Sequence, residues 1–440
     1  MTNNTSTPFP YPELYQRILS LAAMFEGDFS IDWIQELAQS KASHTFLVLE
    51  EAIRRGLVAK TGPVGFRFID HENKTRFRST FRSGEKTQLH MKIADIILQE
   101  DADDSSRALA LAPHLLQIHN DVSGCGWLVK AGKSYRNANH YQTAVKCYEK
   151  ALRDLAEHHN SKADKLFIDA AIGYSKISEV APNSKAVITA LEMSLRRARD
   201  ARNLSQEALI EMHLAKNQWY DTDFDQALKQ FNHAWSLVKD ADDPHLEQTA
   251  AYFSTFFLFW QGRLIDTIQN YEATAPEVEK YPRSRFVLLT GWVIGSAYCA
   301  SGQVTQGMGM LDTIYALSQK EKDFYVTCAV SFGIGSVLLS IGRVEEGEKY
   351  LNDALDMGTK MTNHIIVAYS LLILADLYYM KGKIDACEKK LGRFFENYPD
   401  MHLIGEMVPS LLSLSWAAEN GHIKPGFNLS LEKLIKRVQA

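Results

Sequence analysis

The residues that come nearest to a catalytic motif are two glycines followed by a lysine and a serine. Gly126, Gly132, Lys133 and Ser134 are the residue types of a phosphate-binding loop, in which backbone amides and the lysine hold phosphate oxygens. That motif needs four residues between its glycines, and this chain has five. The stretch also has helical periodicity and does not follow a strand. We therefore expect no nucleotide binding here and no ATP hydrolysis by the purified protein.

Other catalytic and metal-binding patterns are missing from the sequence. It has no HExxH, no GxSxG and no protein-kinase signature, and the adjacent His158 and His159 cannot clamp a metal ion from one helix. The five cysteines are odd in number and lack the close paired spacing of a zinc or redox site, so we expect buried thiols. The sequence therefore predicts a non-enzymatic protein that needs no cofactor and no metal.

Basic residues form the first group that could bind a partner. Residues 54–92 hold ten Lys or Arg against three acids, which would suit nucleic-acid phosphates. The helix that would enter a DNA groove, however, carries Glu50 and Glu51, and phosphate repels carboxylates. We expect this segment to pack or to dock a protein, and contact with nucleic acid is the alternative. The candidate patch consists of Arg54, Arg55, Lys60, Arg67, Arg76, Arg78 and Arg82.

Composition and charge set the class of protein. Of the 440 residues, 46% are hydrophobic and 23% are charged, as in an ordinary globular protein. A formal charge of -5 gives no general attraction to nucleic acid or to an anionic membrane. The first residues lack the features of a signal peptide, and the longest apolar run, residues 250–260, is too short to span a bilayer. We expect a cytoplasmic protein without a membrane partner.

Helical periodicity begins after a polar arm. Apolar stripes predict three helices, at residues 14–25, 31–39 and 43–56, with Ser30 as the cap of the second. The period then changes to that of a short hairpin at residues 57–69, and we expect no other β-structure. Three helices followed by a two-stranded wing are typical of a winged-helix domain. A further apolar stripe predicts a helix over residues 83–99, before an acidic linker.

The stretch that organises the rest of the chain covers residues 131–152. Small and aromatic residues recur in it at the spacing that lets two antiparallel helices pack closely. It resembles the tetratricopeptide repeat, and the matching residues are Gly132, Tyr135, Tyr141, Ala144, Tyr148 and Ala151, with Asn139 in the turn. The resemblance implies a right-handed solenoid of helical hairpins whose concave face binds proteins or peptides.

Glycines mark this unit through the second half of the chain. Gly262, Gly302, Gly342 and Gly382 are evenly spaced, and Gly421 follows at nearly the same interval. Each of the first four precedes a polar and then an apolar residue, as a tight turn before a new buried stripe requires. We predict helical hairpins with a period of about 40 residues, longer than the usual ~34, with these glycines in the turns.

The first helix of each hairpin carries the positions that line the groove in the tetratricopeptide family. Most of these positions are aromatic here, which would suit a peptide, a helix or an apolar ligand. Packing between neighbouring helices explains the same rings equally well. The candidate partner-binding residues are Lys216, Trp219, Tyr220, Tyr252, Phe256, Phe259, Trp260, Trp292, Phe332, Tyr369, Asp376 and Tyr379.

The order of segments carries a second resemblance. The stretches ILSLAAMFEGDFSIDWIQELA, VLEEAIRRGLVAK, GFRFIDH and QLHMKIADIIL, followed by repeats, resemble the region after the nucleotide-binding core of STAND-class signalling ATPases. In that class a winged helix connects the ATPase core to a repeat sensor. The core itself has no counterpart before the winged helix of this chain, so we do not expect its activity.

These features predict an all-α protein in four parts. Residues 1–10 form a flexible arm, 11–100 a winged-helix-like domain, 101–125 a linker with a bridging helix, and 126–440 a tetratricopeptide-like solenoid with a C-terminal capping helix. We expect an adaptor or sensor in bacterial signalling or regulation that binds a protein or peptide in its concave face. The alternative is a transcription regulator whose winged helix contacts DNA while the repeats receive a signal.

Overall fold

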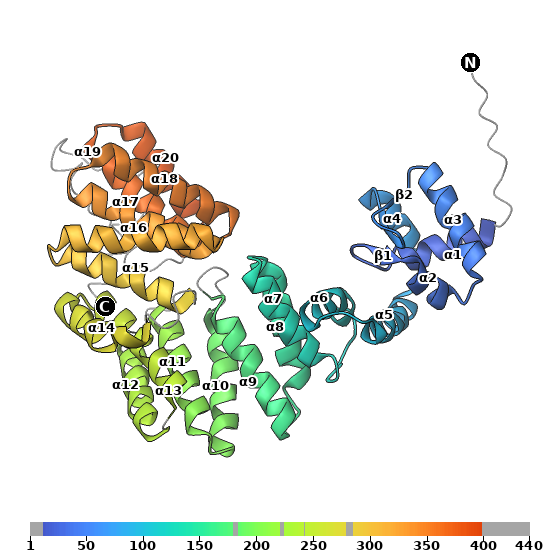
Figure 1. The fold of residues 1–440 in the computed structure, drawn as a ribbon, viewed down its shortest axis with the longest axis horizontal. Coiled ribbons are helices and arrows are strands. Elements are labelled where there is room, and N and C mark those ends of the chain that lie inside the picture. The colour runs from blue at the N-terminus through green and yellow to red at the C-terminus, as the bar shows by residue number, and fades with distance from the viewer. Residues whose placement is uncertain (1–11, 179–183, 221–223, 242, 279–284, 398–440) are drawn as a thin grey trace. The chain divides into compact units, whose positions relative to one another are not determined.

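Helices account for most of the chain. The computed structural model describes residues 12–178, 184–220, 224–241, 243–278 and 285–397. The predicted arm, Gly421 and the predicted capping helix lie outside these residues. The chain divides into two compact units, Met1–Ala138 with Thr143–Ala170, and Asn139–Gln142 with Ala171–Ala440 (Figure 1).

The first unit begins with three helices and a hairpin. Its elements are α1 (Pro12–Ala22), α2 (Ile31–Ala38), α3 (Ala42–Arg54), β2 (Val58–Lys60) and β3 (Gly65–Phe68). As predicted, Ser30 caps α2, because its hydroxyl accepts a hydrogen bond from the amide of Asp32 at 3.1 Å. The hairpin lies within the predicted range of 57–69.

The prediction of a single hairpin is wrong, because a third strand is present. β1 (Phe29–Ser30) pairs antiparallel with β3, which gives the strand order β1-β3-β2. The buried ring of Phe29 packs on Phe66 and Phe68, with ring centroids 6.1 and 6.2 Å apart, and this contact holds β1 at the sheet edge. A strand of two residues is too short for its periodicity to be visible in a sequence.

Two helices depart from the prediction between the sheet and the repeats. No helix is predicted at α4 (His71–Arg78), because Phe77 is its only buried residue and no apolar stripe exists. α5 (Ser83–Gln99) agrees with the predicted range, but α6 (Asp104–Leu115) begins inside the predicted acidic linker. The reason is a cap, since the Asp103 carboxylate accepts hydrogen bonds from the amides of Ser105 and Ser106.

The stretch that resembles a tetratricopeptide repeat is helical. It covers the second half of α7 (Cys125–Asn137) and most of α8 (Tyr141–Leu155), and α9 (Ser161–Ser175) follows. Gly132 faces the ring of Tyr148, and a Cβ added to that glycine would lie 2.8 Å from the ring carbons. The small residue is therefore needed for the ring to pack. Because Gly132 and Lys133 lie within α7, they do not form a phosphate-binding loop, as predicted.

Helical hairpins follow one another in the second unit (Figure 1). Its helices are α10 (Ser184–Asp200), α11 (Leu204–Tyr220), α12 (Phe224–Ala241), α13 (Pro244–Trp260), α14 (Leu264–Val278), α15 (Arg285–Ala300), α16 (Val304–Lys320), α17 (Phe324–Ser340), α18 (Val344–Lys360), α19 (His364–Met380) and α20 (Ile384–Asn397). Gly262, Gly302, Gly342 and Gly382 each lie in the turn inside a hairpin, with φ between 67° and 90°. Left-handed backbone of this kind favours glycine, and the predicted register is confirmed at all four.

A second set of glycines lets the two helices of a hairpin touch backbone to backbone. A Cβ on Gly307 of α16 would lie 2.5 Å from the carbonyl oxygen of Gly295 on α15. The next hairpin repeats the arrangement in register, because a Cβ on Gly347 would lie 2.9 Å from the carbonyl oxygen of Gly335. These pairs set the distance between the two helices, and they determine which side of the first helix packs against the second.

Candidate functional site

The hairpins of the second unit place their first helices side by side. α11 contacts α13, α13 contacts α15, α15 contacts α17 and α17 contacts α19, so that these five helices form a continuous layer. In a solenoid, equivalent positions of successive repeats lie on the same face of such a layer. All the predicted groove residues lie on these five helices. The layer is therefore the candidate site, and we call it the inner layer.

Burial separates the predicted groove residues into classes. Lys216 and Phe256 are buried, with 5% and 6% of their surface exposed, whereas Asp376 is exposed. The side chain of Tyr220 lies outside the described part of the chain. The remaining residues are half-buried, namely Trp219, Tyr252, Phe259, Trp260, Trp292, Phe332, Tyr369 and Tyr379. Half-burial leaves part of each of these side chains exposed to solvent.

Most predicted rings meet at the α11–α13 end of the inner layer. Trp219 packs edge-on against Phe257, with ring centroids 5.5 Å apart. On α13, Trp260 contacts both Phe256 and Phe259, at 6.2 and 5.5 Å. Tyr252 packs against the core formed by α11, α12 and α13 and also against the core that includes α15 and α17. This end forms a connected aromatic surface.

At the other end, packing explains part of the predicted set. The Trp292 indole lies over Gly333 of α17, where an added Cβ would be 2.5 Å from its Nε1 atom. Gly333 therefore serves close helix packing, and Trp292 fills the space above it. Phe332 contacts Tyr369 on α19, with ring centroids 6.3 Å apart. The Asp376 side chain on α19 is exposed, but its carboxyl is partly desolvated by its surroundings, which raises the pKa of that carboxyl above its usual range.

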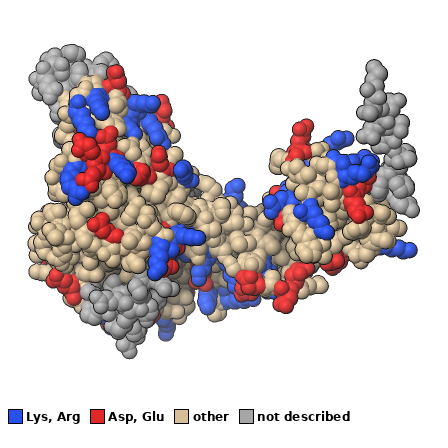
Figure 2. All heavy atoms as spheres, turned by 45° about the horizontal axis from the view of Figure 1, so that its top comes forward, with Lys and Arg blue, Asp and Glu red and all other residues tan. Residues whose placement is uncertain are grey.

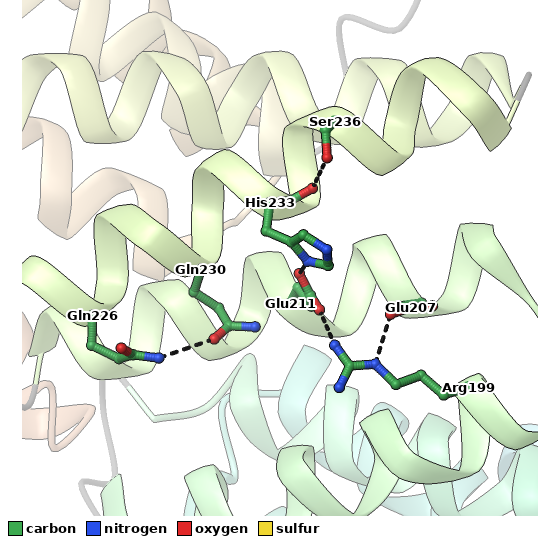
Figure 3. A network of polar contacts seen from close by, with 7 residues as sticks. All are labelled: Arg199, Glu207, Glu211, Gln226, Gln230, His233 and Ser236. Atoms are coloured by element: carbon green, nitrogen blue, oxygen red, sulfur yellow. Dashed lines mark hydrogen bonds and ion pairs between the residues drawn. The ribbon is translucent and has the colours of Figure 1, made fainter.

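A cluster of charged residues in the second unit matches no motif of the sequence (Figure 3). The Glu211 carboxylate on α11 is fully buried, and it accepts hydrogen bonds from Arg199 on α10 at 2.7 Å and from His233 on α12. Arg199 also donates to Glu207 at 2.7 Å. Of the residues drawn, Ser236 has the only hydroxyl, and it donates to the backbone carbonyl of His233. The cluster therefore holds three helices together and offers no activated nucleophile.

The repeat register is the signal that would have found this cluster. Glu211 occupies a position that Ala251, Gly291, Ser331 and Leu371 occupy in the successive repeats. The other four side chains are small or apolar, as a helix-packing position requires. A carboxylate in such a series must be paired, because an isolated buried charge is strongly unfavourable.

Acidic neighbours neutralise much of the predicted basic patch in the first unit. Arg54 and Arg55 both donate to Glu51. Arg67 pairs with Asp28, and Arg78 pairs with Glu26. Figure 2 likewise shows Lys and Arg interspersed with Asp and Glu on the face in view. Pairing of this kind reduces the charge that the patch could offer to phosphate groups.

Neither thiol nor metal chemistry is indicated in the part of the chain that the structure describes. All five cysteines are buried and free, as predicted, and burial raises the pKa of Cys147 and Cys328 to about 12. No group of three His, Cys, Asp or Glu side chains among the described residues could hold a metal ion. None of the helices described is long and apolar enough to cross a bilayer.

Comparison with protein families and curated proteins gives one match. The tetratricopeptide repeat family matches residues 369–400, which cover most of α19 and α20. No curated protein matches the sequence. The family match places one repeat in the chain by sequence alone, and it falls at the hairpin whose turn holds Gly382.

Solved structures show a similar fold at low sequence identity. A Signal Transduction ATPase with Numerous Domains (STAND) from Pyrococcus horikoshii, which has a tetratricopeptide repeat sensor, is 12% identical, with a TM-score of 0.50 over 97% of this chain. This chain spans 63% of the length of that protein. A Rap protein in complex with Competence and Sporulation Factor is 10% identical, with a TM-score of 0.53 over 72% of this chain and 94% of its own.

A second Rap protein extends this likeness. The Rap conjugation gene regulator of plasmid pLS20, in complex with the Phr* peptide, is 13% identical, with a TM-score of 0.53 over 75% of this chain and 94% of its own. Identities this low establish the fold alone. The helical hairpins, the turn glycines and the family match agree with that fold. The chain is a tetratricopeptide-like repeat protein with an all-α solenoid architecture.

Proposed function

We propose that the inner layer, α11 to α19, binds a peptide or an extended segment of another protein, and that the chain is a non-enzymatic sensor or adaptor in signalling. The observation that carries this proposal is the half-buried aromatic surface of the inner layer. Rings with one packed side are held in place before a ligand arrives, so little conformational entropy is lost on binding.

The similar structures support the class of ligand. One Rap protein is in complex with Competence and Sporulation Factor and the other with the Phr* peptide, and the STAND protein has a tetratricopeptide repeat sensor. These proteins share the fold with this chain and little sequence, so the ligand of this chain must be found by experiment. This chain spans 63% of the length of the STAND protein, and we propose no ATPase activity for it.

The test uses a random peptide library displayed against the full chain, followed by affinity measurements on labelled peptides that the library yields. Tyr252→Ala and Phe259→Ala should weaken binding at least about tenfold, which corresponds to about 1.4 kcal/mol. Phe324→Ala is the control, because Phe324 is a phenylalanine that is more exposed than Phe259 and lies at the start of α17, away from the predicted groove positions.

Thermal unfolding of the same variants separates binding from packing. Removing a ring that is only half-buried should lower the melting temperature slightly, whereas removing a core phenylalanine costs about 3–5 kcal/mol. A large loss of thermal stability in both variants would assign Tyr252 and Phe259 to the core. Peptides that bind equally well to both variants and to the wild type would place the site elsewhere.

A further inference from the structure

One helix of the first unit presents apolar side chains to solvent. On α3, the exposed fractions of Phe46 and Leu47 are 48% and 47%, and that of Ile53 is 37%. No other helix in the described part of the chain has three large hydrophobic residues this exposed. Residues 46, 47, 50, 53 and 54 recur at helical spacing, so they share one face of α3. We call this set the α3 face.

The charged residues of α3 differ in whether they have an ion-pair partner. Arg54 and Arg55 both bind Glu51, with the Arg54 Nη2 atom 2.7 Å from its carboxylate. Glu50, in the middle of the exposed apolar residues, is exposed and makes no ion pair or side-chain hydrogen bond with any residue that the structure describes. The two arginines at the end of α3 are therefore already paired with Glu51, and among the described residues Glu50 is a negative charge with no ion-pair partner, among apolar neighbours.

We propose that the α3 face docks an amphipathic helix of a partner protein that carries a Lys or Arg between apolar residues. The apolar positions 46 and 53 lie seven residues apart, which is about two turns of helix and ~10 Å. A helix with anchors at the same spacing can cover Phe46, Leu47 and Ile53 together. Its cation would then meet Glu50 where apolar contacts exclude water, and there an ion pair is stronger than on an open surface.

The same features argue against double-stranded DNA on this face. A helix that enters the major groove meets phosphates on both sides, and Glu50 would be repelled by them. Phe46 and Leu47 offer no hydrogen bonds to base edges. The α3 face and the inner layer belong to different units of the chain, so loss of binding at one of them leaves the other unaffected.

The probe is a synthetic helical peptide of about five turns, with a leucine stripe interrupted by one lysine. Its control has glutamate in place of that lysine. Fluorescence anisotropy with the full chain should show the lysine peptide binding about tenfold more tightly than the glutamate peptide, a difference of ~1.4 kcal/mol. A Glu50→Lys variant should reverse this preference.

Phe46→Ser should weaken binding of the lysine peptide. Met91→Ser, which removes a similarly exposed residue from α5, should leave that binding unchanged.

Several results would overturn the proposal. Equal binding of both peptides, or no change of preference in Glu50→Lys, would remove the role of the charge. Loss of binding in Phe259→Ala but not in Phe46→Ser would assign the peptide to the inner layer. Displacement of the lysine peptide by a short DNA duplex would make α3 a nucleic-acid surface. Because Glu50 is exposed, its substitution leaves the fold intact, and the reversal can be read even if Phe46→Ser unfolds.

Discussion

Two buried histidines join α5 to α6 in the first unit. The Nδ1 atoms of His90 and His114 are 2.9 Å apart, and each residue is 2% exposed. Burial lowers the pKa of His90 to about 4 and that of His114 to about 3. The charge of Arg78 contributes to both of these lowered pKa values, and that of Glu26 opposes them. Both rings are therefore neutral at pH 7, and one donates a hydrogen bond to the other.

This pair makes the stability of the first unit depend on pH. In the unfolded chain a histidine has a pKa of about 6.5, so the unfolded state binds more protons than the folded state below that pH. The stability contributed by the neutral pair is complete above pH 6.5 and is lost as the pH falls from 6.5 to about 4 for His90 and to about 3 for His114. Each ring contributes a slope of up to about 1.4 kcal/mol per pH unit.

Thermal unfolding between pH 7.5 and 4.5 tests this expectation. The melting temperature of the wild type should fall more steeply with decreasing pH than that of a His90→Gln, His114→Gln double variant. Other groups that titrate in this range act on both proteins and cancel in the comparison. Parallel curves for the two proteins would mean that the pair is hydrated or already charged in solution.

The buried carboxylate of Glu211 should also contribute to the stability of the fold. Glu211→Gln keeps the shape of the side chain but removes the charge that Arg199 and His233 share. Arg199 and His233 are about half exposed and can regain water, which limits the loss to ~1–2 kcal/mol in urea unfolding. Glu207→Gln is the control, because Glu207 bonds Arg199 alone and should change stability by less. A more stable Glu211→Gln variant would show that the desolvation of the carboxylate outweighs its contacts.

At the level of elements, the paired glycines of α15 and α16 allow a direct test of helix spacing. A Cβ on Gly307 would approach the carbonyl oxygen of Gly295 to 2.5 Å, whereas a Cβ on Gly309 meets no atom within 4 Å. Gly307→Ala should therefore lose about 1–3 kcal/mol in urea unfolding. Gly309→Ala, on the same helix, should gain up to ~1 kcal/mol from its helix propensity. Equal effects of the two substitutions would refute the backbone contact.

The elements that sequence could predict are those with a period or a strict backbone requirement. The turn glycines were predictable because left-handed backbone restricts the residue type, and their spacing made the hairpins visible. β1 and α4 were not, because two residues show no period and a helix with one buried residue shows no stripe. α6 extends beyond its apolar stripe because a side-chain cap, and not burial, decides where it begins.

The helices that carry the predicted groove residues were predictable, but the accessibility of the individual side chains was not. The register placed every predicted residue on the first helices, yet Phe256 is buried and Trp292 covers Gly333. The repeat register predicts the side of the helix on which a side chain lies. Its solvent accessibility depends on the size of the side chain that it faces in the next repeat. For Trp292 that neighbour is a glycine in the following repeat, far from the tryptophan in the sequence.

At the level of the whole molecule, a repeat array responds to damage locally. Each hairpin of the second unit contacts its neighbours in sequence, so destabilisation spreads along the array and weakens with distance. Hydrogen exchange of the Gly307→Ala variant should accelerate in α15, α16 and α17. The amides of α1 to α5 should exchange as in the wild type. Uniform acceleration throughout the chain would indicate a single cooperative unit instead.

Because the turn glycines are evenly spaced, each repeat is a unit that a deletion in the gene could remove in register. Removing residues 303–342 would join Gly302 to Arg343, and Gly295 would then face Gly347 as it now faces Gly307. The packing between neighbouring hairpins would be disrupted by this deletion, because Trp292 would face Ile373 in place of Gly333. Deletion of a repeat thus preserves the glycine contact within a hairpin but disrupts the contact between neighbouring hairpins. Gain or loss of a repeat therefore requires a compensating change on the first helix of the neighbouring hairpin.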